Sequence, residues 1–411
     1  MSKKKNQPQR ESICVVGLGY IGLPTSAALA ARGFTIHGVE ISQDVVDTIN
    51  AGDTHIVEPE LDLLVRAAVD SGRLKAHTEP GEADVFMICV PTPLTSEKTA
   101  DLNAVWSASK AIAPFVRPGN LVILESTSPP KATERMEEIV LEASGLNPGE
   151  VHFAHAPERV LPGHILREVI ENDRIVGGTN EAATAAAANF YEKFVSGRVL
   201  QTTARTAELA KLVENSYRDT NIAFANELSL VCDDLEIDVW ELIALANRHP
   251  RVNILTPGPG VGGHCLAVDP WFIVELVPDT ARLIRTSREV NESKPEWIVS
   301  RVKKKAERFR KPRIACLGLA YKPDVDDLRE SPALEIAIQL AKADIGEVFA
   351  IDPYVESHPD LTMRPLEDGM EDIDIVILLV GHRQFKRMPR QWLREKAVID
   401  VCGMFAQLNI D

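Results

Sequence analysis

Short apolar runs alternate with helical segments along the first half of the chain. Residues 12–22 form an apolar strand that ends in glycines, residues 24–31 are helical in pattern, and residues 34–40 form a second apolar run. Further runs of strand length follow at 84–90, 120–126, 151–156 and 174–178. Strands that alternate with helices usually pair in parallel and are covered on both faces. The pattern therefore predicts a doubly wound parallel sheet.

The middle of the chain has a different pattern. Neither glycine nor proline occurs between Arg198 and His249, so residues 206–237 are predicted to form one long helix. A helix of about 30 residues would span about 45 Å, the length of a spine between domains or of a subunit interface. A second helical region is predicted from about Asp279 to Arg308, interrupted at Pro295.

The last part of the chain repeats the opening pattern. RIACLGLAYKP at 313–323 resembles ICVVGLGYIG near the start, and apolar runs follow at 348–352, 373–380 and 397–401. The predicted fold is therefore α/β, with two Rossmann-like doubly wound domains joined by a long central helix. The expected boundaries are a disordered basic tail at 1–10, a first Rossmann domain at 11–200, a helical central and dimerisation domain at 201–300 and a second Rossmann-like domain at 301–411.

Composition narrows the class of protein. The 411 residues carry a formal charge of -15, which argues against a general nucleic-acid or anionic-membrane partner. No apolar run approaches the roughly 20 residues of a membrane span, and the basic start is not followed by the apolar segment of a signal peptide. The six cysteines form no CxxC pair, which favours a reduced, cytoplasmic protein. The histidines lack metal-ligand spacing, so no metal site is predicted.

The first glycine turn has the form GxGxxG. Gly17, Gly19 and Gly22 follow a strand and open a helix, the setting in which such a turn admits a pyrophosphate. Tyr20 and Ile21 lie within the motif and are included as cofactor contacts. A carboxylate at the end of the second strand, Glu40, would accept from ribose hydroxyls and repel a 2′-phosphate, so NAD is preferred over NADP. The alternative is a glycine turn in a sheet that binds nothing.

Other candidates follow strand ends, where ligands bind in doubly wound sheets. Thr92 in CVPTP and Thr127 in ESTSPP are candidate cofactor contacts, and HAPERVLPG places Glu158 and Arg159 similarly. In the second glycine turn Pro323 takes the place of Gly22, which argues against a dinucleotide there. Its cations, Lys322 and Arg329, could bind a diphosphate, or they could belong to a solvated loop with local Asp–Arg pairs.

Two further groups have candidate chemistry. Lys211, Asn215 and Arg218 share one face of the long helix, and Glu208 joins them at i−3. Such a stripe is either a solvated face or a site where the lysine stabilises an oxyanion or transfers a proton. In PGVGGHCLAVDPW, Cys265 follows a glycine run and Asp269 comes four residues later. This segment is either a tight loop or a nucleophile held against a ligand.

Taken together, GLGYIGLP, VPTP, ESTSPP, APERVLPG, ELAKLVENSYRDTNIAFANE, PGVGGHC..D and GLAYKP..DDLRESP resemble the UDP-glucose/GDP-mannose dehydrogenases, in order and over almost the whole chain. The runs at 247–274 and 281–291 are most similar to the bacterial branch that acts on UDP-N-acetyl-D-mannosamine. The resemblance implies a four-electron oxidation of a UDP-sugar at C6 with two NAD+ per turnover, an NAD-binding first domain and a UDP-sugar-binding last domain.

The resemblance also implies roles for individual residues. Cys265 matches the nucleophile, Lys211 the oxyanion or proton-transfer group with Asn215 beside it, and Asp269 and Glu158 the carboxylates of water activation. Thr127 matches a position that contacts cofactor and orders catalytic water. Arg251 is expected to reach into a neighbouring subunit. The positions that match substrate contacts are Arg159, Val160, Lys211, Asn215, Arg218, His249, Arg251, Gly262, Tyr321 and Lys322. Arg329 is counted with the cofactor contacts on the nucleotide-side loop.

Two departures from the family pattern bear on specificity. Glu40 stands where the family more often has Asp, which affects cofactor affinity more than cofactor identity. Pro162 and Gly163 replace an acidic-glycine pair of the UDP-glucose enzymes, which counts against UDP-glucose as the substrate.

Overall fold

The computed structural model describes residues 11–161, 163–368 and 370–405. The basic tail predicted at 1–10 and Pro162 lie outside these residues. The chain divides into two compact units, Met1–Val213 and Glu214–Asp411, and each is described by itself. The long helix α8 (Ala204–Asp234) crosses the boundary between them, and its 31 residues confirm the predicted central helix.

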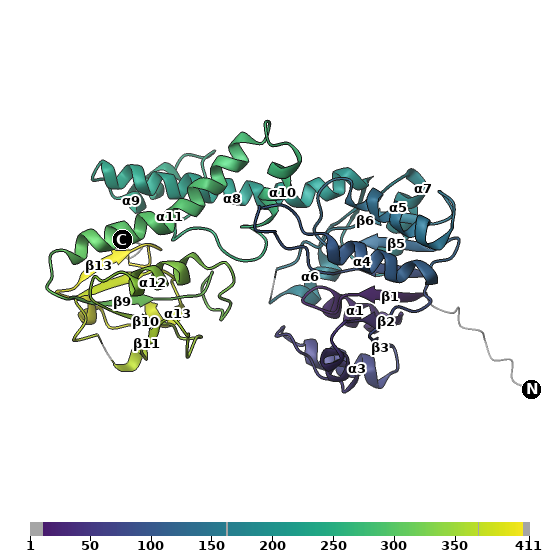
Figure 1. Cartoon of the computed structure of the whole chain (residues 1–411), viewed down its shortest axis with the longest axis horizontal. Coiled ribbons are helices and arrows are strands. Elements are labelled where there is room, and N and C mark those ends of the chain that lie inside the picture. Colours follow the sequence, from purple (N-terminus) through teal and green to yellow (C-terminus); the bar gives the residue numbers. More distant parts are fainter. Residues whose placement is uncertain (1–10, 162, 369, 406–411) are drawn as a thin grey trace, which may run out of the picture. The chain divides into compact units, whose positions relative to one another are not determined.

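The first unit contains an eight-stranded sheet with the order β3-β2-β1-β4-β5-β6-β7-β8. Figure 1 labels β1, β2, β3, β5 and β6 of this sheet. Its strands are β1 (Ser12–Val16), β2 (Thr35–Val39), β3 (Leu74–His77), β4 (Val85–Ile88), β5 (Leu121–Leu124), β6 (His152–His155), β7 (Arg174–Gly178) and β8 (Val199–Thr203). Its helices are α1 (Gly22–Ala31), α2 (Gln43–Asn50), α3 (Leu61–Asp70), α4 (Asn103–Ile112), α5 (Ala132–Ser144), α6 (Ile165–Glu171) and α7 (Glu181–Tyr191), with a 3-10 turn at Ala113–Phe115.

Both faces of this sheet are covered, as the apolar runs predict. Along β1, Ile13 and Val15 join the core with α1, α3 and α7, whereas Cys14 and Val16 join the core with α4 and α5. Alternate side chains of a strand point to opposite faces, so a fully apolar strand requires a layer on each side. The edge strands β3 and β8 were absent from the prediction because their sequences, LKAH and VLQTT, mix polar and apolar residues.

The prediction of a wholly parallel sheet is wrong at one edge. β7 pairs with β6 in antiparallel fashion, through Ala154 with Gly178 and His155 with Gly177, and β8 is parallel to β7. An antiparallel neighbour needs no crossover to the opposite end of the sheet. The connection that contains α6 therefore starts and ends on the same side of the sheet, at the carboxyl end of β6. Arg174, the first residue of β7, lies beside that end.

The second unit holds the rest of α8 and a five-stranded parallel sheet with the order β11-β10-β9-β12-β13. The strands are β9 (Arg313–Leu317), β10 (Glu347–Ile351), β11 (Thr362–Met363), β12 (Ile375–Leu378) and β13 (Ala397–Asp400). The helices are α9 (Val239–Ala246), α10 (Asp269–Leu276), α11 (Arg282–Ala306), α12 (Pro332–Lys342) and α13 (Arg383–Lys386), with 3-10 turns at Leu366–Asp368 and Arg390–Leu393. The second Rossmann-like sheet predicted from the repeat is thus confirmed.

The interruption predicted at Pro295 does not occur, because α11 continues through it as one helix of 25 residues. Proline lacks an N–H, so the carbonyl four residues earlier, on Asn291, loses its helical partner. Pro295 is buried, and the next turns place Ile298, Val299 and Val302 in the apolar core of the second sheet. Burial of this face keeps the helix continuous despite the missing bond.

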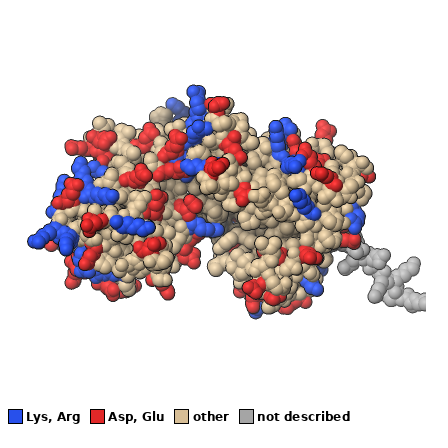
Figure 2. Space-filling model, viewed as in Figure 1, with Lys and Arg blue, Asp and Glu red and all other residues tan. Residues whose placement is uncertain are grey.

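Charges of both signs are interspersed over the face shown in Figure 2, where the blue Lys and Arg side chains lie among red Asp and Glu. None of the helices in the described part of the chain is both long and apolar enough to cross a membrane.

Candidate active site

The first glycine turn is shaped by contacts that exclude side chains. Gly17 has φ +94°, and a Cβ there would lie 2.6 Å from the carbonyl oxygen of Cys89. A Cβ on Gly22 would lie 1.8 Å from the carbonyl oxygen of Gly17. With any larger residue at position 22, the helix could not start so close to the turn. A Cβ on Gly19 would meet no atom within 4 Å. The loop thus leaves its backbone open at the middle glycine, where a pyrophosphate would approach.

Glu40 lies at the end of β2, as predicted. Its Oε2 accepts a hydrogen bond from the N–H of Leu18 at 3.1 Å, and its Oε1 accepts from its neighbour Ile41 at 2.9 Å. The carboxylate is therefore fixed against the glycine turn, where a ribose would follow a bound pyrophosphate. The glycine cradle and this carboxylate together fit the adenosine half of NAD. Tyr20 and Ile21 lie on the same turn, and the Tyr20 side chain is exposed.

Two predicted cofactor contacts meet at the carboxyl ends of β4 and β5. The hydroxyl of Thr92 donates to the carbonyl oxygen of Thr127 at 2.8 Å. Ser126 donates to the carbonyl oxygen of Val90 at 2.7 Å, which ties the same two loops together. The fold therefore brings CVPTP and ESTSPP side by side, next to the strand that carries the glycine turn.

Glu158 is anchored in a buried polar cluster. Its Oε2 accepts from Nη1 of Arg174 at 2.7 Å, and its Oε1 accepts from the backbone N–H of Arg159 at 2.6 Å. The side chains of Arg174 and Glu158 are 5% and 8% exposed, so this ion pair is nearly removed from water. Burial lowers the pKa of Arg174, but the charges of Glu158 and Glu125 outweigh burial and raise that pKa above its usual range. Arg174 thus stays charged beside Glu158.

A second carboxyl belongs to this cluster and was not among the predicted site residues. Glu125 accepts from the hydroxyl of Tyr191 at 2.6 Å and from the thiol of Cys89 at 3.4 Å. Burial raises the pKa of Glu125, and the charge of Glu158 raises it further, against the opposing effect of Arg174. Glu125 is part of the ESTSPP motif, but Arg174 and Tyr191 come from β7 and α7, and no sequence signal linked them to Glu158.

The second glycine turn repeats the backbone of the first. Gly318 has φ +90° and its N–H donates to the carbonyl of Ile351 at 2.9 Å, as the N–H of Gly17 does to Val39 at 2.8 Å. Asp352, at the end of β10, takes the place of Glu40 and accepts from the N–H of Leu319 at 2.6 Å. The repeat inferred from the sequence therefore extends to the carboxylate.

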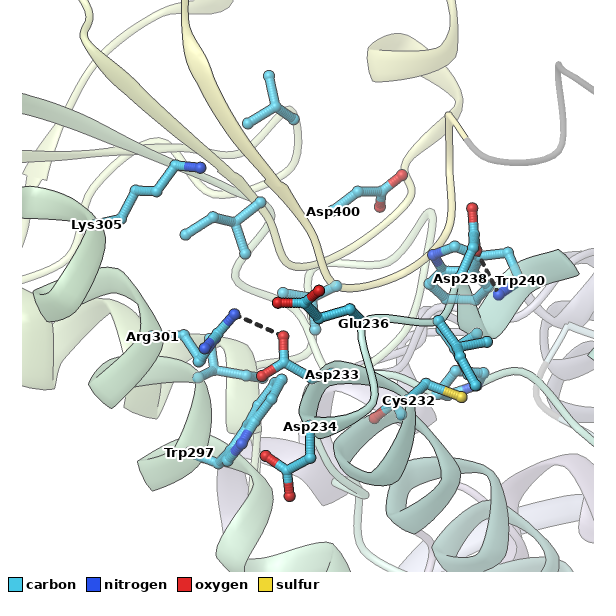
Figure 3. Close-up of a pocket in the computed structure, with 18 of the residues that line it drawn as sticks. Cys232, Asp233, Asp234, Glu236, Asp238, Trp240, Trp297, Arg301, Lys305 and Asp400 are labelled. Atoms are coloured by element: carbon cyan, nitrogen blue, oxygen red, sulfur yellow. Dashed lines mark hydrogen bonds and ion pairs between the residues drawn. The ribbon is translucent and has the colours of Figure 1, made fainter. Parts of the chain in front are cut away.

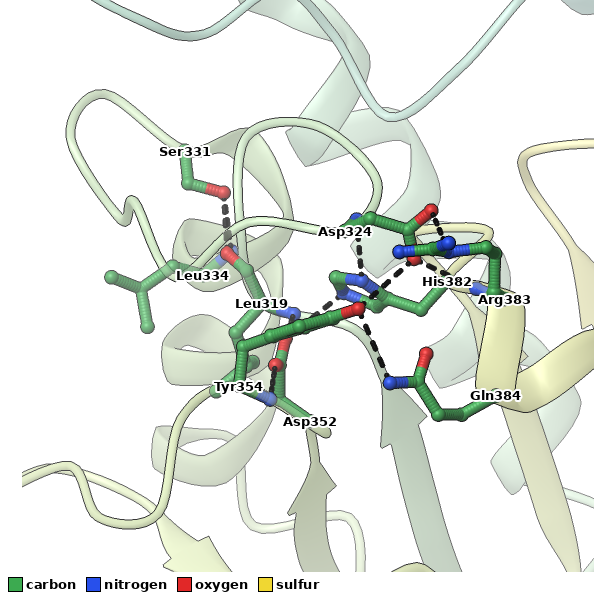
Figure 4. Close-up of polar contacts among 9 residues, drawn as sticks. All are labelled: Leu319, Asp324, Ser331, Leu334, Asp352, Tyr354, His382, Arg383 and Gln384. Carbon is green, nitrogen blue, oxygen red and sulfur yellow. Dashed lines mark hydrogen bonds and ion pairs between the residues drawn. The ribbon is translucent and has the colours of Figure 1, made fainter. Parts of the chain in front are cut away.

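The carboxylate of this second turn is closed off from a ribose. The His382 Nε2 lies 3.2 Å from Oδ2 of Asp352, and both side chains are fully buried (Figure 4). The other ring nitrogen, Nδ1, accepts from the N–H of Asp324 at 2.9 Å, so Nε2 is the nitrogen that donates to Asp352. Burial raises the pKa of Asp352, but the hydrogen bonds from His382, Leu319 and Tyr354 outweigh it and hold that pKa below its usual value.

The cations of this loop are held locally. Arg329 forms a bidentate pair with Asp327, with Nε–Oδ1 at 2.9 Å and Nη2–Oδ2 at 2.6 Å. The sequence left two alternatives for this arginine, a diphosphate site or a local Asp–Arg pair, and the structure contains the local pair. The Nζ of Lys322 lies 5.4 Å from the centre of the Tyr321 ring. Both predicted substrate positions, Tyr321 and Lys322, are half-buried.

The loop that carries Cys265 packs tightly against this second nucleotide-type domain. Gly263 donates to the carbonyl of Arg329 at 3.2 Å and has φ +83°, and a Cβ there would lie 2.9 Å from the Tyr321 ring. A Cβ on Gly262 would lie 2.2 Å from the carbonyl oxygen of Glu330. The glycines therefore serve close backbone approach, which only a residue without a side chain permits.

Two predicted catalytic residues meet behind this loop. The Asn215 Nδ2 donates to Oδ2 of Asp269 at 2.5 Å, and the backbone N–H of Asp269 donates to the carbonyl of Cys265 at 2.8 Å. Asp269 is buried at the start of α10, whereas Cys265 is half-buried. Asn215 on α8 and Asp269 after the Cys265 loop are 54 residues apart in the chain. The fold thus brings an amide, a carboxylate and a thiol-bearing turn together.

The polar face predicted on α8 is only partly correct. Arg218 is exposed, and Lys211 and Asn215 are half-buried. Glu208 is fully buried and does not belong to an exposed stripe, because it accepts from the N–H groups of Lys131 and Thr133 at 2.8 and 2.7 Å. These N–H groups lie at the start of α5, where helical donors lack internal partners. Glu208 therefore fixes the loop that follows Thr127.

Four predicted substrate positions remain. His249 and Arg251 are exposed on the segment after α9. Val160 packs against Ala28 and Ile165, and the Arg159 Nη1 donates to the carbonyl of Asp173 at 3.3 Å. The predicted residues numbered up to Lys211 belong to the first unit and those from Asn215 onward to the second.

A cavity of about 900 Å³ in the second unit is lined by none of the predicted site residues. One wall carries acidic residues near the end of α8, the other carries α11, and Arg301 crosses to Asp233 at 2.6 Å (Figure 3). The Nζ of Lys294 lies 4.3 Å from the centre of the Trp297 ring. Burial lowers the pKa of Lys294 to about 8. Five acidic and five basic side chains line this cavity.

Three domain models of the UDP-glucose/GDP-mannose dehydrogenase family match the chain: the NAD binding domain at 11–195, the central domain at 205–293 and the UDP binding domain at 315–407. The chain belongs to this family. It is accordingly an NAD-dependent oxidoreductase of the nucleotide-sugar dehydrogenase type, and its two nucleotide-type turns fall in the two outer models.

Individual members of the family are similar to this chain over nearly its full length. An NDP-N-acetyl-D-galactosaminuronic acid dehydrogenase of Ralstonia nicotianae is 52% identical over 97% of each chain. A UDP-N-acetyl-D-mannosamine dehydrogenase of Campylobacter jejuni is 51% identical over 92% of this chain and 97% of its own. The solved structure of a UDP-D-ManNAc dehydrogenase from Pyrococcus horikoshii is 40% identical, with a TM-score of 0.89 over 96% of each chain.

Proposed function

We propose that this enzyme oxidises UDP-N-acetyl-D-mannosamine at C6 to UDP-N-acetyl-D-mannosaminuronate, a four-electron oxidation that uses two NAD+ per turnover. The observation that carries the proposal is the turn from Cys265 to Asp269, where a thiol precedes a buried carboxylate that is bonded to Asn215. A binding protein has no use for a thiol nucleophile in such a turn, which disfavours a non-catalytic nucleotide-sugar sensor. Relatives that are 51% and 48% identical are named UDP-N-acetyl-D-mannosamine dehydrogenases, which supports this sugar.

The chemistry requires a group that retains the intermediate. NAD+, when bound, accepts a hydride in each oxidation. The first oxidation leaves an aldehyde at C6, and the Cys265 thiolate adds to its carbonyl carbon to form a thiohemiacetal. Loss of a hydride and a proton converts this adduct into a thioester. Water then attacks the thioester carbon, releases the carboxylate and restores the thiol.

The other proposed residues manage charge and water. The Lys211 ammonium stabilises the oxyanion that forms when sulfur or water adds, or accepts and returns a proton. Asn215 orients Asp269, and Asp269 or Glu158 activates the hydrolytic water. Thr127 contacts cofactor and orders that water. Arg159, Val160, Arg218, His249, Arg251, Gly262, Tyr321 and Lys322 are proposed to contact the sugar nucleotide, and Arg329 the cofactor.

Assembly as a homodimer or higher homo-oligomer is part of the proposal. α8 carries a row of exposed apolar side chains with helical spacing, Leu209, Val213, Tyr217, Phe224 and Val231, and the exposed Leu235 directly follows its last residue. Such a row on one helix fits the same row on a second copy in a two-fold interface. Sedimentation should give a dimer or larger, and Phe224→Glu should shift it toward monomer. A monomeric wild type would contradict this part.

A substrate panel with NADH stoichiometry tests the activity. UDP-N-acetyl-D-mannosamine should yield two NADH per sugar, and activity confined to UDP-glucose or UDP-N-acetyl-D-glucosamine would refute the assignment. The N-acetyl-galactosamine nucleotide belongs in the panel because of the Ralstonia relative. Cys265→Ala should lose the second oxidation, and two NADH per sugar from that variant would refute the covalent route. We place the reaction in the cytoplasm, where its product would enter surface polysaccharide.

A further inference from the structure

Four buried polar side chains of the second unit, none of which has a role in the proposed chemistry, meet in one network. TNIAFANE on α8 supplies Asn226, SYRDT supplies Asp219, and SREVN on α11 supplies Arg288 and Asn291. All four side chains are buried, with exposures of 2% or less. The α8 and α11 residues that pair are 65 to 72 positions apart in the chain.

The hydrogen bonds of this network run in one direction, with each group donating to the next from Gly258 through Asn226 and Asn291 to Asp219. Arg288 donates from Nη1 to Oδ1 of Asp219 at 2.6 Å, and Asn291 donates from Nδ2 to the same oxygen at 2.8 Å. Asn226 donates from Nδ2 to Oδ1 of Asn291 at 2.8 Å. The Oδ1 of Asn226 then accepts from the backbone N–H of Gly258 at 2.8 Å.

The carboxylate sets this direction. Burial raises the pKa of Asp219, and the charge of Arg288 opposes that rise. The Asn291 Nδ2 donates to Oδ1 of Asp219 and, at 3.1 Å, to its carbonyl oxygen, so the amide of Asn291 turns its NH2 toward Asp219 and its oxygen toward Asn226. Asn226 must in turn present its NH2 to Asn291, which leaves its oxygen for the N–H of Gly258. A reversed amide at either position would oppose two donors or two acceptors in a buried site, which is costly.

The same network also holds the far end of the loop. Arg288 donates from Nη2 to Glu292 at 3.3 Å, and the Trp271 indole donates to the same carboxylate oxygen at 3.1 Å. Cys265 lies between Gly258 and Trp271. We propose that Asn226 and Asn291 are positioning residues that fix the Cys265 loop by presenting an oriented acceptor to the N–H of Gly258.

Hydrogen exchange tests this proposal without any substrate. In full-length Asn226→Leu, amides of residues 258–271 should exchange about fivefold faster, the factor expected for one net hydrogen bond. Asn226→Asp keeps an acceptor for Gly258 but places a second acceptor against Oδ1 of Asn291, so it should recover only part of the protection. It also serves if the leucine variant does not fold. Asn221→Ala is the control, because its amide bonds to Tyr217 of its own helix turn. Peptides before Glu214 supply the internal reference.

The second readout rests on the proposed function. A displaced Cys265 should let aldehyde escape, so Asn226→Leu should form fewer than two NADH per sugar and yield an aldehyde that semicarbazide traps. Unchanged exchange at 258–271 in both Asn226 variants would overturn the proposal whatever the substrate. Faster exchange with two NADH per sugar would overturn it as well, because the loop would then be anchored without positioning the thiol. A wild type that forms no NADH with any sugar nucleotide would refute the proposed function. The exchange at residues 258–271 would still decide whether Asn226 and Asn291 fix the Cys265 loop.

Discussion

Acid should destabilise the first unit through His155, the last residue of β6. The ring is completely buried, and neither of its nitrogens has a hydrogen-bond partner among the described residues. Burial lowers the pKa of His155 from 6.5 to about 3. The folded protein therefore keeps this ring neutral, while the unfolded chain takes up a proton as the pH falls below 6.5. Stability from the neutral ring is complete above that value and is lost between pH 6.5 and about pH 3.

The size of this loss of stability follows from how far the pH falls below the pKa of His155 in the unfolded chain. One pKa unit corresponds to about 1.4 kcal/mol, and pH 5 lies about 1.5 units below the unfolded value. His155 alone should thus lower the free energy of unfolding by about 2 kcal/mol between about pH 7.5 and about pH 5. Replacement by leucine removes the titrating group, so His155→Leu should lose this part of the pH dependence.

Urea unfolding at the two pH values measures the difference. Pulse-labelling hydrogen exchange of peptides before Glu214 follows the unfolding of the first unit at each urea concentration. Phe153→Leu on the same strand is the matched control, because it loses buried packing without losing a titrating group. Its stability should fall by the same amount at both pH values. If His155→Leu keeps the pH dependence of the wild type to within about 0.5 kcal/mol, the reasoning from burial is wrong.

Three other changes test contacts of the first unit. Gly22→Ala should abolish NAD binding in calorimetry, because its Cβ would lie 1.8 Å from the carbonyl oxygen of Gly17; wild-type affinity would contradict the turn geometry. Arg174→Met should lower the free energy of unfolding by about 3 kcal/mol, because Glu158 is then buried without its charge partner. The double variant with Glu158→Gln should lose less than the sum of the two single changes. Additive losses in urea unfolding would mean that the pair is uncoupled. Glu208→Gln should cost about 1–3 kcal/mol, since an amide has one acceptor oxygen for donors that now share two, and an unchanged unfolding midpoint would argue against this anchor.

Local patterns were sufficient for most elements of the fold. Apolar runs of strand length and the absence of glycine and proline between Arg198 and His249 predicted both sheets and α8, because strand and helix periodicity is a property of neighbouring residues. The polar edge strands and the continuity of α11 at Pro295 were not predicted correctly. Those depend on which face a distant layer buries, and packing outweighs local preference there.

The candidate site divides in the same way. The sequence by itself determined the two glycine turns, Glu40 and the Cys265 loop, because turns and close backbone approaches demand particular residues at fixed spacing. Only the tertiary structure decided that Arg174 meets Glu158, since that contact follows from the antiparallel entry of β7. It also decided that the Asn226 amide is oriented through a carboxylate on its own helix and an asparagine 65 residues away. Burial and partner choice arise from packing between remote segments, which no local pattern encodes.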